Sequence, residues 1–252
     1  MDLTLPAFLK QIVFDIREIL APRMCIICNR RLQINEKLVC SGCLTKLPYT
    51  FYQGRSENGA VRLFYGQIII ERGSAYFYYF TGADSRKILF ALKYHHQPEI
   101  GLLFGKMMAR ELIRTDFFKD IDALIPVPLA PLRQQQRGYN QSEWLAMGVA
   151  EITGLPIWNE IVKRTVENRT QTHLNHLERR RNVEGIFHCI HPEKLKNKHV
   201  LVIDDVVTTG STLTSCIRAM QGIQGAKFSV LTLAQAASPT SLPGHIVPDF
   251  DI

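Results

Sequence analysis

Short apolar runs alternate with segments of helical apolar spacing along most of this 252-residue chain. The apolar runs are rich in β-branched residues and lack polar alternation, a pattern typical of strands buried on both faces. Such strands are expected at 121–129, 200–203 and 227–234. Helices are expected over 84–114 with a break near 95–98, over 140–152 and over 213–222. This alternation predicts an α/β fold with a parallel sheet flanked by helices.

The first eighty residues follow a different pattern. Apolar residues between 1 and 20 are spaced along one helical face, which predicts an amphipathic helix rather than an export signal. Residues 53–60 have the composition of a loop, and 67–80 contain two apolar runs that predict an aromatic β-hairpin. The expected domains are therefore an N-terminal module at 1–52 and a larger domain at 60–252, with a hairpin hood at 60–82.

Four cysteines of the N-terminal module form two matched C-x₂-C pairs: Cys25, Cys28, Cys40 and Cys43. Thiolates at this spacing predict a tetrahedral structural zinc site. The alternatives are a redox dithiol, or two disulfides of a secreted protein. Zinc is favoured because no export signal is visible and the two pairs match. The other two cysteines, Cys189 and Cys216, are expected to be core residues.

Two acidic residues and a turn rich in hydroxyl groups follow the strand at 200–203. The candidate site residues are Asp204, Asp205, Val206, Val207, Thr208, Thr209, Gly210, Ser211 and Thr212. Glycine permits a positive φ, so backbone N–H groups can converge on a phosphate beside the next helix. Because carboxylates suit ribose hydroxyls or Mg²⁺, the segment predicts a ribose 5-phosphate site. The plainer alternative is a turn in which Thr209 or Ser211 caps a helix.

Basic residues mark three further candidates. Arg137 and Gly138 end a basic loop that starts at Arg133, a position suited to a pyrophosphate group. Between 163 and 181 six basic residues stand against two acidic ones. This segment either closes over a polyphosphate as a lid or is a solvated basic face. Lys93 could reach a pyrophosphate, although a surface lysine is the default expectation.

Overall charge and hydropathy narrow the function classes. The formal net charge is +7, which favours phosphate-rich partners. No apolar stretch approaches the roughly 20 residues that a membrane-spanning helix needs. With neither a span nor an export signal, a cytoplasmic protein is expected.

In their shared order, these motifs resemble one family, the ComF-like competence proteins, a phosphoribosyltransferase-like branch with an N-terminal cysteine module. The resemblance covers nearly the whole chain. It is carried by 91–94, 125–129, 137–141, 203–205 and 208–212, with Gln171, Leu174, Arg179, Asn182, Gly185 and Phe187. Many relatives carry a further cysteine pair, which residues 44–60 lack.

The resemblance implies a type I phosphoribosyltransferase core that binds phosphoribosyl pyrophosphate (PRPP) with Mg²⁺. It also implies a role in single-stranded DNA uptake during natural competence, with DNA and other competence proteins as partners. The implied roles are ribose contact for Asp204 and Asp205, 5-phosphate binding for 208–212, pyrophosphate binding for Arg137 and Gly138, and the lid for Arg179 and Asn182.

Two other functions stay open at this point. One is an active small-molecule phosphoribosyltransferase with a nucleobase or amine acceptor. The other is a regulator that reads PRPP without transferring it, since function belongs to sites and not to folds. The residues identify no acceptor pocket.

Overall fold

The structure is a computed structural model that describes residues 20–80, 82–165 and 185–237. The predicted helix at 1–19 lies outside these residues. The chain divides into two compact units, Met1–Leu47 and Pro48–Ile252. The expected boundary at 52 moves to Leu47, because the following segment hydrogen bonds to the larger unit. Thr50 N donates to Tyr76 O at 3.1 Å, and Tyr78 N donates to Pro48 O at 2.7 Å.

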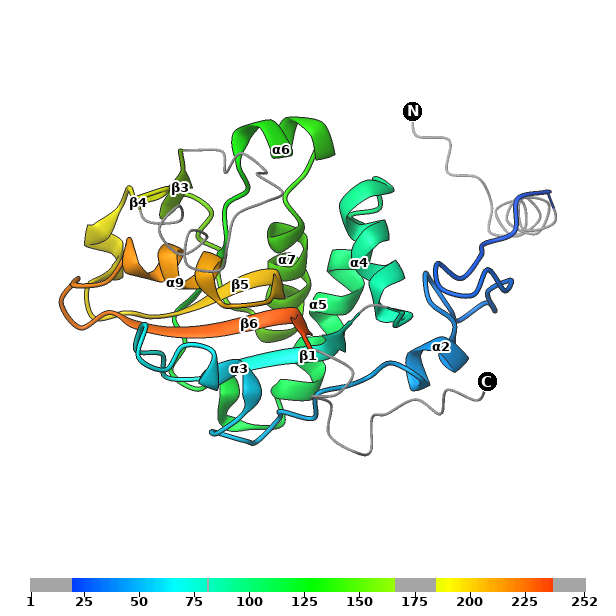
Figure 1. The fold of residues 1–252 in the computed structure, drawn as a ribbon, viewed down its shortest axis with the longest axis horizontal. Coiled ribbons are helices and arrows are strands. Elements are labelled where there is room, and N and C mark those ends of the chain that lie inside the picture. The colour runs from blue at the N-terminus through cyan, green and yellow to red at the C-terminus, as the bar shows by residue number, and fades with distance from the viewer. Residues whose placement is uncertain (1–19, 81, 166–184, 238–252) are drawn as a thin grey trace, which may run out of the picture. The chain divides into compact units, whose positions relative to one another are not determined.

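The larger unit is built on a four-stranded parallel sheet in the order β1-β6-β5-β2 (Figure 1). Its strands are β1 (Gly73–Tyr79), β2 (Ala123–Pro126), β5 (His199–Val207) and β6 (Lys227–Ala236). The register places Ile125 beside Val202, and Val202 beside Val230. The strands predicted at 121–129, 200–203 and 227–234 are confirmed, as is the parallel sheet.

Helices form at most of the predicted positions. They are α2 (Ser41–Thr45), α3 (Gly59–Arg62), α4 (Ser85–Tyr94), α5 (Glu99–Leu112), α6 (Pro131–Arg137), α7 (Gln141–Thr153) and α9 (Ser211–Arg218). The smaller elements are the 3-10 turns Asp116–Phe118 and Pro192–Leu195 and an antiparallel ribbon of β3 (Val162–Arg164) and β4 (Phe187–Cys189). No helix within the described ranges is long and apolar enough to cross a membrane.

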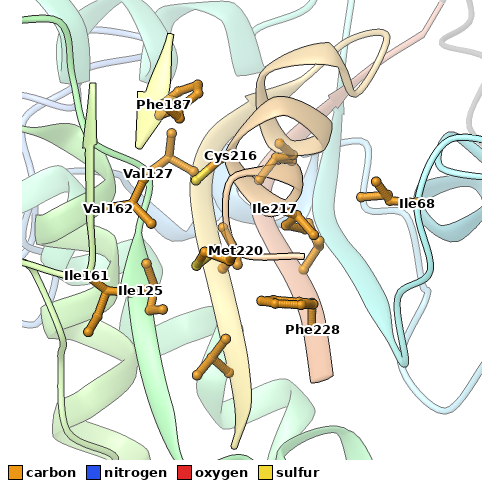
Figure 2. Packing of buried hydrophobic residues seen from close by; sticks show 14 of the residues in the cluster. Ile68, Ile125, Val127, Ile161, Val162, Phe187, Cys216, Ile217, Met220 and Phe228 are labelled. Atoms are coloured by element: carbon orange, nitrogen blue, oxygen red, sulfur yellow. The ribbon is translucent and has the colours of Figure 1, made fainter. Parts of the chain in front are cut away.

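Both faces of the central strands are buried, as the unbroken apolar runs predict. Val200 and Val202 of β5 belong to a core cluster on the α9 side. Figure 2 shows Cys216 and Ile217 of α9 packed in this cluster, with Ile125 of β2 nearby. Helix α7 packs against β2 and β5. Cys216 is a core residue, as predicted, whereas Cys189 is half-buried.

Two local predictions are wrong. The hairpin at 67–80 does not form, because β1 pairs in parallel with β6 and Tyr49 bridges to Phe77 on its other side. Ile68 instead packs into the core at the end of a turn, where its N–H donates to Phe64 O at 3.2 Å. The basic loop from Arg133 is helical, because Pro131 starts α6 and Gly138 ends it in the left-handed conformation, with φ 77°.

Glycines let α5 and α7 approach to backbone contact. A Cβ added to Gly105 would clash with the Leu145 carbonyl oxygen, and one added to Gly148 would clash with the Leu102 carbonyl oxygen. Helix α7 begins with Asn140 as its N-cap, whose side chain accepts from Ser142 N at 3.1 Å and donates to Val127 O at 3.0 Å. This packing fixes the start of α7 beside the carboxyl end of β2.

Candidate functional site

The two predicted acidic residues lie at the carboxyl end of β5, next to the start of α7. Asp204 Oδ1 accepts hydrogen bonds from Ser142 Oγ at 3.0 Å and from Asp205 N at 2.9 Å. Burial, followed by repulsion from Asp205, raises the pKa of Asp204 to about 7. A carboxyl group whose pKa lies near neutral pH, at the carboxyl end of a central strand, is typical of a binding or catalytic site.

Lys93 lies against these acids and is not a simple surface lysine. Its Nζ is 3.0 Å from Asp205 Oδ2, and both side chains are largely buried. Burial opposes the charge of the ammonium group, but attraction to Asp205 outweighs it and raises the pKa of Lys93. The helix that carries Lys93 is therefore tied to the end of β5 by an ion pair across more than 100 residues of sequence.

The hydroxyl-rich turn joins β5 to α9. Gly210 has φ 77° and is the N-cap of α9. Thr209 Oγ1 and Ser211 Oγ are 2.7 Å apart and hydrogen bonded. A small hollow of about 40 Å³ is lined by Asp204 and residues 206–213. It has the chemistry of an anion site, since backbone N–H groups at a helix N-terminus and hydroxyl groups both donate.

A larger cavity of about 540 Å³ opens beside the acids. It is bounded by the ends of β2 and β5, by the starts of α6 and α7, and by one face of α4. Five cationic side chains line it: Arg86, Lys93, Arg133, Arg137 and Arg164. Asp204 and Asp205 are the only acidic side chains among the described residues that line it, so the cavity favours a polyanion.

Arg137 lines this cavity, whereas Gly138 has a structural role at the end of α6. Arg137 Nη1 donates to Gln141 Oε1 at 2.8 Å, and its guanidinium lies 5.5 Å from the centroid of the Tyr94 ring. Gly138 is the left-handed C-cap of α6 and is not among the residues that line the cavity. Asp204, Asp205, Val206, Thr208 and Thr212 line it, while the other predicted turn residues line the small hollow.

Several residues of the cavity escape prediction from the sequence. Arg164 of β3 is partly buried, and its Nε has no hydrogen-bond partner among the described residues, while its guanidinium lies 5.3 Å from the Phe187 ring centroid. Burial, then the nearby Arg133, lowers the pKa of Arg164. Ser142 and the aromatic pair Phe90 and Tyr94 were also missed. No motif marks Phe90 or Ser142 as a site residue, whereas Tyr94 lies in the motif at 91–94 and Arg164 in the basic segment at 163–181. The fold brings all four residues to one cavity.

The predicted lid residues Arg179 and Asn182 lie outside the described residues. The ends of that segment are described, and they form the β3–β4 ribbon. Val162 pairs with Cys189, and Arg164 pairs with Phe187. The ribbon therefore brings Arg164, at the segment's start, to the cavity.

The four cysteines of the smaller unit form a separate cluster. All six cysteines of the chain are free thiols in the described residues. The sulfurs of Cys25, Cys28, Cys40 and Cys43 lie within 4.8 Å of one another. Cys28 Sγ and Cys40 Sγ are 3.7 Å apart, close to the roughly 3.8 Å that tetrahedral Zn–S bonds of about 2.3 Å require. The cluster has the geometry to hold a metal ion.

The backbone of the cluster favours the thiolate form of Cys25. Burial disfavours the thiolate of Cys25, but backbone N–H donors from Cys28, Cys40 and Ile27 together lower its pKa to about 7. Cys40 N lies 3.4 Å from Cys25 Sγ. Backbone donors to sulfur are typical of metal-binding knuckles, because they stabilise the negative charge of the ligands.

Comparisons with known proteins agree with this geometry. The phosphoribosyl transferase domain family matches residues 98–247. Competence protein F of Haemophilus influenzae is 30% identical over 222 residues, which cover 84% of this chain and 96% of that protein. The DNA utilization protein YhgH of Escherichia coli K12 is 31% identical over 50% of this chain and 56% of that protein.

Among solved structures, the allosteric regulatory enzyme of purine biosynthesis aligns with a TM-score of 0.37 and 20% identity. The alignment covers 54% of this chain and 25% of that chain. The family match over most of the larger unit and the near full-length relative settle the assignment. The chain belongs to the phosphoribosyl transferase domain family, in its ComF-like branch.

Proposed function

We propose that the larger unit binds PRPP together with Mg²⁺. The observation that carries this proposal is the pairing of two adjacent anion sites with the acids at the end of β5. The small hollow suits a 5-phosphate, and Asp204 and Asp205 suit the vicinal ribose hydroxyls. Arg137 and Lys93 suit the pyrophosphate group.

The donor set is also suited to the metal. Mg²⁺ prefers carboxylate and phosphate oxygens and keeps several waters, so one or two acids beside a polyphosphate are enough. When bound, the ion would neutralise the pyrophosphate leaving group. Lys93 would then exchange its contact with Asp205 for one with the ligand, because the diol needs the same carboxylate oxygens.

We place this protein in single-stranded DNA uptake during natural competence, as a cytoplasmic protein. The support is the names of its relatives, Competence protein F and DNA utilization protein. The net charge of +7 and the cationic cavity are consistent with a phosphate-rich partner. For the smaller unit we propose a structural zinc ion on its four cysteines, because all four positions would be filled by protein sulfur.

Calorimetric titration of PRPP with Mg²⁺ tests the site. We expect the double variant Asp204→Asn and Asp205→Asn to bind at least about tenfold more weakly than the wild type, since hydrogen bonds to charged groups contribute about 1.5–3 kcal/mol each. Asp84→Asn is the matched control: it removes a carboxylate that pairs with Lys87 on the surface and should change nothing.

Retained PRPP affinity in the double variant would refute the site. A pyrophosphate-release assay on the same samples, with and without single-stranded DNA, separates binding from transfer. Release that depends on a nucleobase or amine would identify an active phosphoribosyltransferase.

A further inference from the structure

Two aromatic side chains at the cavity have no role in the core. Phe90 and Tyr94 lie one turn apart on α4, and their ring centroids are 4.8 Å apart with an interplanar angle of 43°. Phe90 is 51% exposed and Tyr94 is 57% exposed, yet both line the cavity. Exposed aromatic rings grouped at a cavity mark a surface that another ring system can cover.

Positive charge surrounds this aromatic pair. Arg86 lies one turn before Phe90 on α4, so Arg86, Phe90 and Tyr94 form one stripe along the helix. The Arg137 guanidinium lies 5.5 Å from the Tyr94 ring centroid on the side of α6. Arg86 and Arg137 both line the cavity. A ligand that contacts the rings therefore meets cations on both sides.

A buried amide holds one of these cations in place. Gln141 is almost fully buried and lines the cavity, and its side chain interacts with both Arg137 and the Tyr139 hydroxyl. Its Oε1 accepts a hydrogen bond from Arg137. Gln141 therefore holds Arg137 beside the aromatic pair.

We propose that Phe90 and Tyr94 form a stacking site for an unpaired base of single-stranded DNA, with neighbouring phosphates on Arg86 and Arg137. The stacking site depends on the proposed function only for the identity of its partner, single-stranded DNA. It specifies which residues of the chain contact that DNA. Aromatic rings beside cations are the arrangement that binds single strands without reading their sequence. Duplex DNA is excluded from such a site, because its bases are stacked on each other.

The exposure of the rings favours a strand over a free base. A small acceptor is normally enclosed on most of its surface. Here each ring is more than half exposed, so a base can be laid on it from outside while its backbone continues along the surface. The stripe along α4 also offers two rings and a cation in series, which suits consecutive nucleotides.

The test compares oligonucleotides that differ only in their bases. Fluorescence anisotropy would measure binding of labelled oligo-dT of about 15 nucleotides and of an abasic strand of equal length, at one salt concentration. We expect the wild type to bind oligo-dT about tenfold more tightly than the abasic strand. In the double variant Phe90→Ala and Tyr94→Ala, oligo-dT affinity should fall to the abasic level while abasic affinity stays constant.

Three further variants make the test specific. Phe90→Tyr and Tyr94→Phe keep the rings and should retain the preference for bases. Tyr65→Ala removes an aromatic ring of similar exposure, 55%, that does not line the cavity, and it should have no effect. An equal loss for both strands in the double alanine variant would overturn the stacking site, as would an unchanged preference for bases.

Titrations with free thymine and with PRPP distinguish the stacking site from an acceptor pocket and from the proposed PRPP site. If free thymine displaces oligo-dT at matching concentrations of base, the site is an acceptor pocket and the strand proposal fails. PRPP titration of the variants Phe90→Tyr and Tyr94→Phe should match the wild type, because both keep a ring at each position and so keep the Tyr94 ring position beside Arg137 filled. If the wild type binds oligo-dT by its bases but does not bind PRPP, the proposed PRPP function fails and the stacking site stands.

Discussion

At the scale of single residues, Asp204 destabilises the protein that uses it. The folded state raises its pKa to about 7, above the value of about 3.9 in an unfolded chain. The unfolded state therefore holds fewer protons between these values, so the free energy of unfolding falls as pH rises from about 4 through 7. Strain of this kind is typical of functional sites, where stability is exchanged for binding.

We expect Asp204→Asn to stabilise the free protein by about 1–2 kcal/mol near pH 8. The amide oxygen can still accept from Ser142 Oγ and Asp205 N, so the local geometry is retained. Thermal unfolding at several pH values would measure the gain, which should shrink toward pH 5 because the wild-type carboxyl is then protonated. A variant less stable than the wild type at every pH would contradict the assignment of buried charge.

The candidate site shows which functional residues a sequence motif can identify and which it cannot. Residues 204–212 are contiguous, so their acids, hydroxyls and glycine identify an anion site before any fold is known. Lys93 and Arg164 belong to the same cavity, but they lie 111 and 40 residues before Asp204 in the chain. Their type alone suggests a surface charge, and only the folded sheet shows their partners.

At the scale of elements, the contact between α5 and α7 supports the site from behind. Gly105 and Gly148 face each other across this contact, and α7 carries Ser142, which holds Asp204. We expect Gly148→Ala to destabilise the protein by about 2 kcal/mol or more and to weaken ligand binding, because a methyl group there must push the helices apart.

Chemical denaturation and PRPP titration would measure both effects. Gly42→Ala is the matched control, because Gly42 lies in helix α2 and an added Cβ meets nothing within 4 Å. That control should be neutral or slightly stabilising, since alanine favours helix more than glycine does. Equal stability of the two variants would show that the helices have room to separate.

Element prediction succeeded where the pattern was local and failed where the partner was distant. Helices α4, α5 and α7 and strands β5 and β6 have strong periodicity or continuous burial. Strand β1 was expected to pair with the run just before it, yet its partner β6 lies about 150 residues later. Helix α6 was expected to be a loop because it has no buried residue and no apolar face.

At the scale of the whole molecule, the two units have different sources of stability. The larger unit, from Pro48 onward, buries a sheet on both faces. The described residues of the smaller unit, 20–47, include few buried apolar ones, among them Ile27, Leu32 and Val39. Chains with so little core usually depend on a metal or on disulfides, and its cysteines are free thiols.

We therefore expect the variant Cys40→Ser and Cys43→Ser to lose its metal and unfold the smaller unit only. Metal analysis should find about one zinc ion per wild-type chain and none in the variant, because structural zinc supplies folding free energy. Limited proteolysis should cut the variant before Leu47, while PRPP titration of the larger unit stays unchanged. Ser41→Ala, which leaves all four thiols in place, is the control for metal content.

The zinc content and ligand affinities of this variant would show which unit binds which ligand. Retained zinc in the Cys40→Ser and Cys43→Ser variant would refute the metal cluster, since two of its four ligands would be gone. Loss of PRPP affinity together with zinc would show that the larger unit depends on the smaller one for its fold. Unchanged PRPP affinity combined with weaker oligo-dT binding would instead mean that the smaller unit contributes to DNA binding. Residues of both units would then contact the DNA strand.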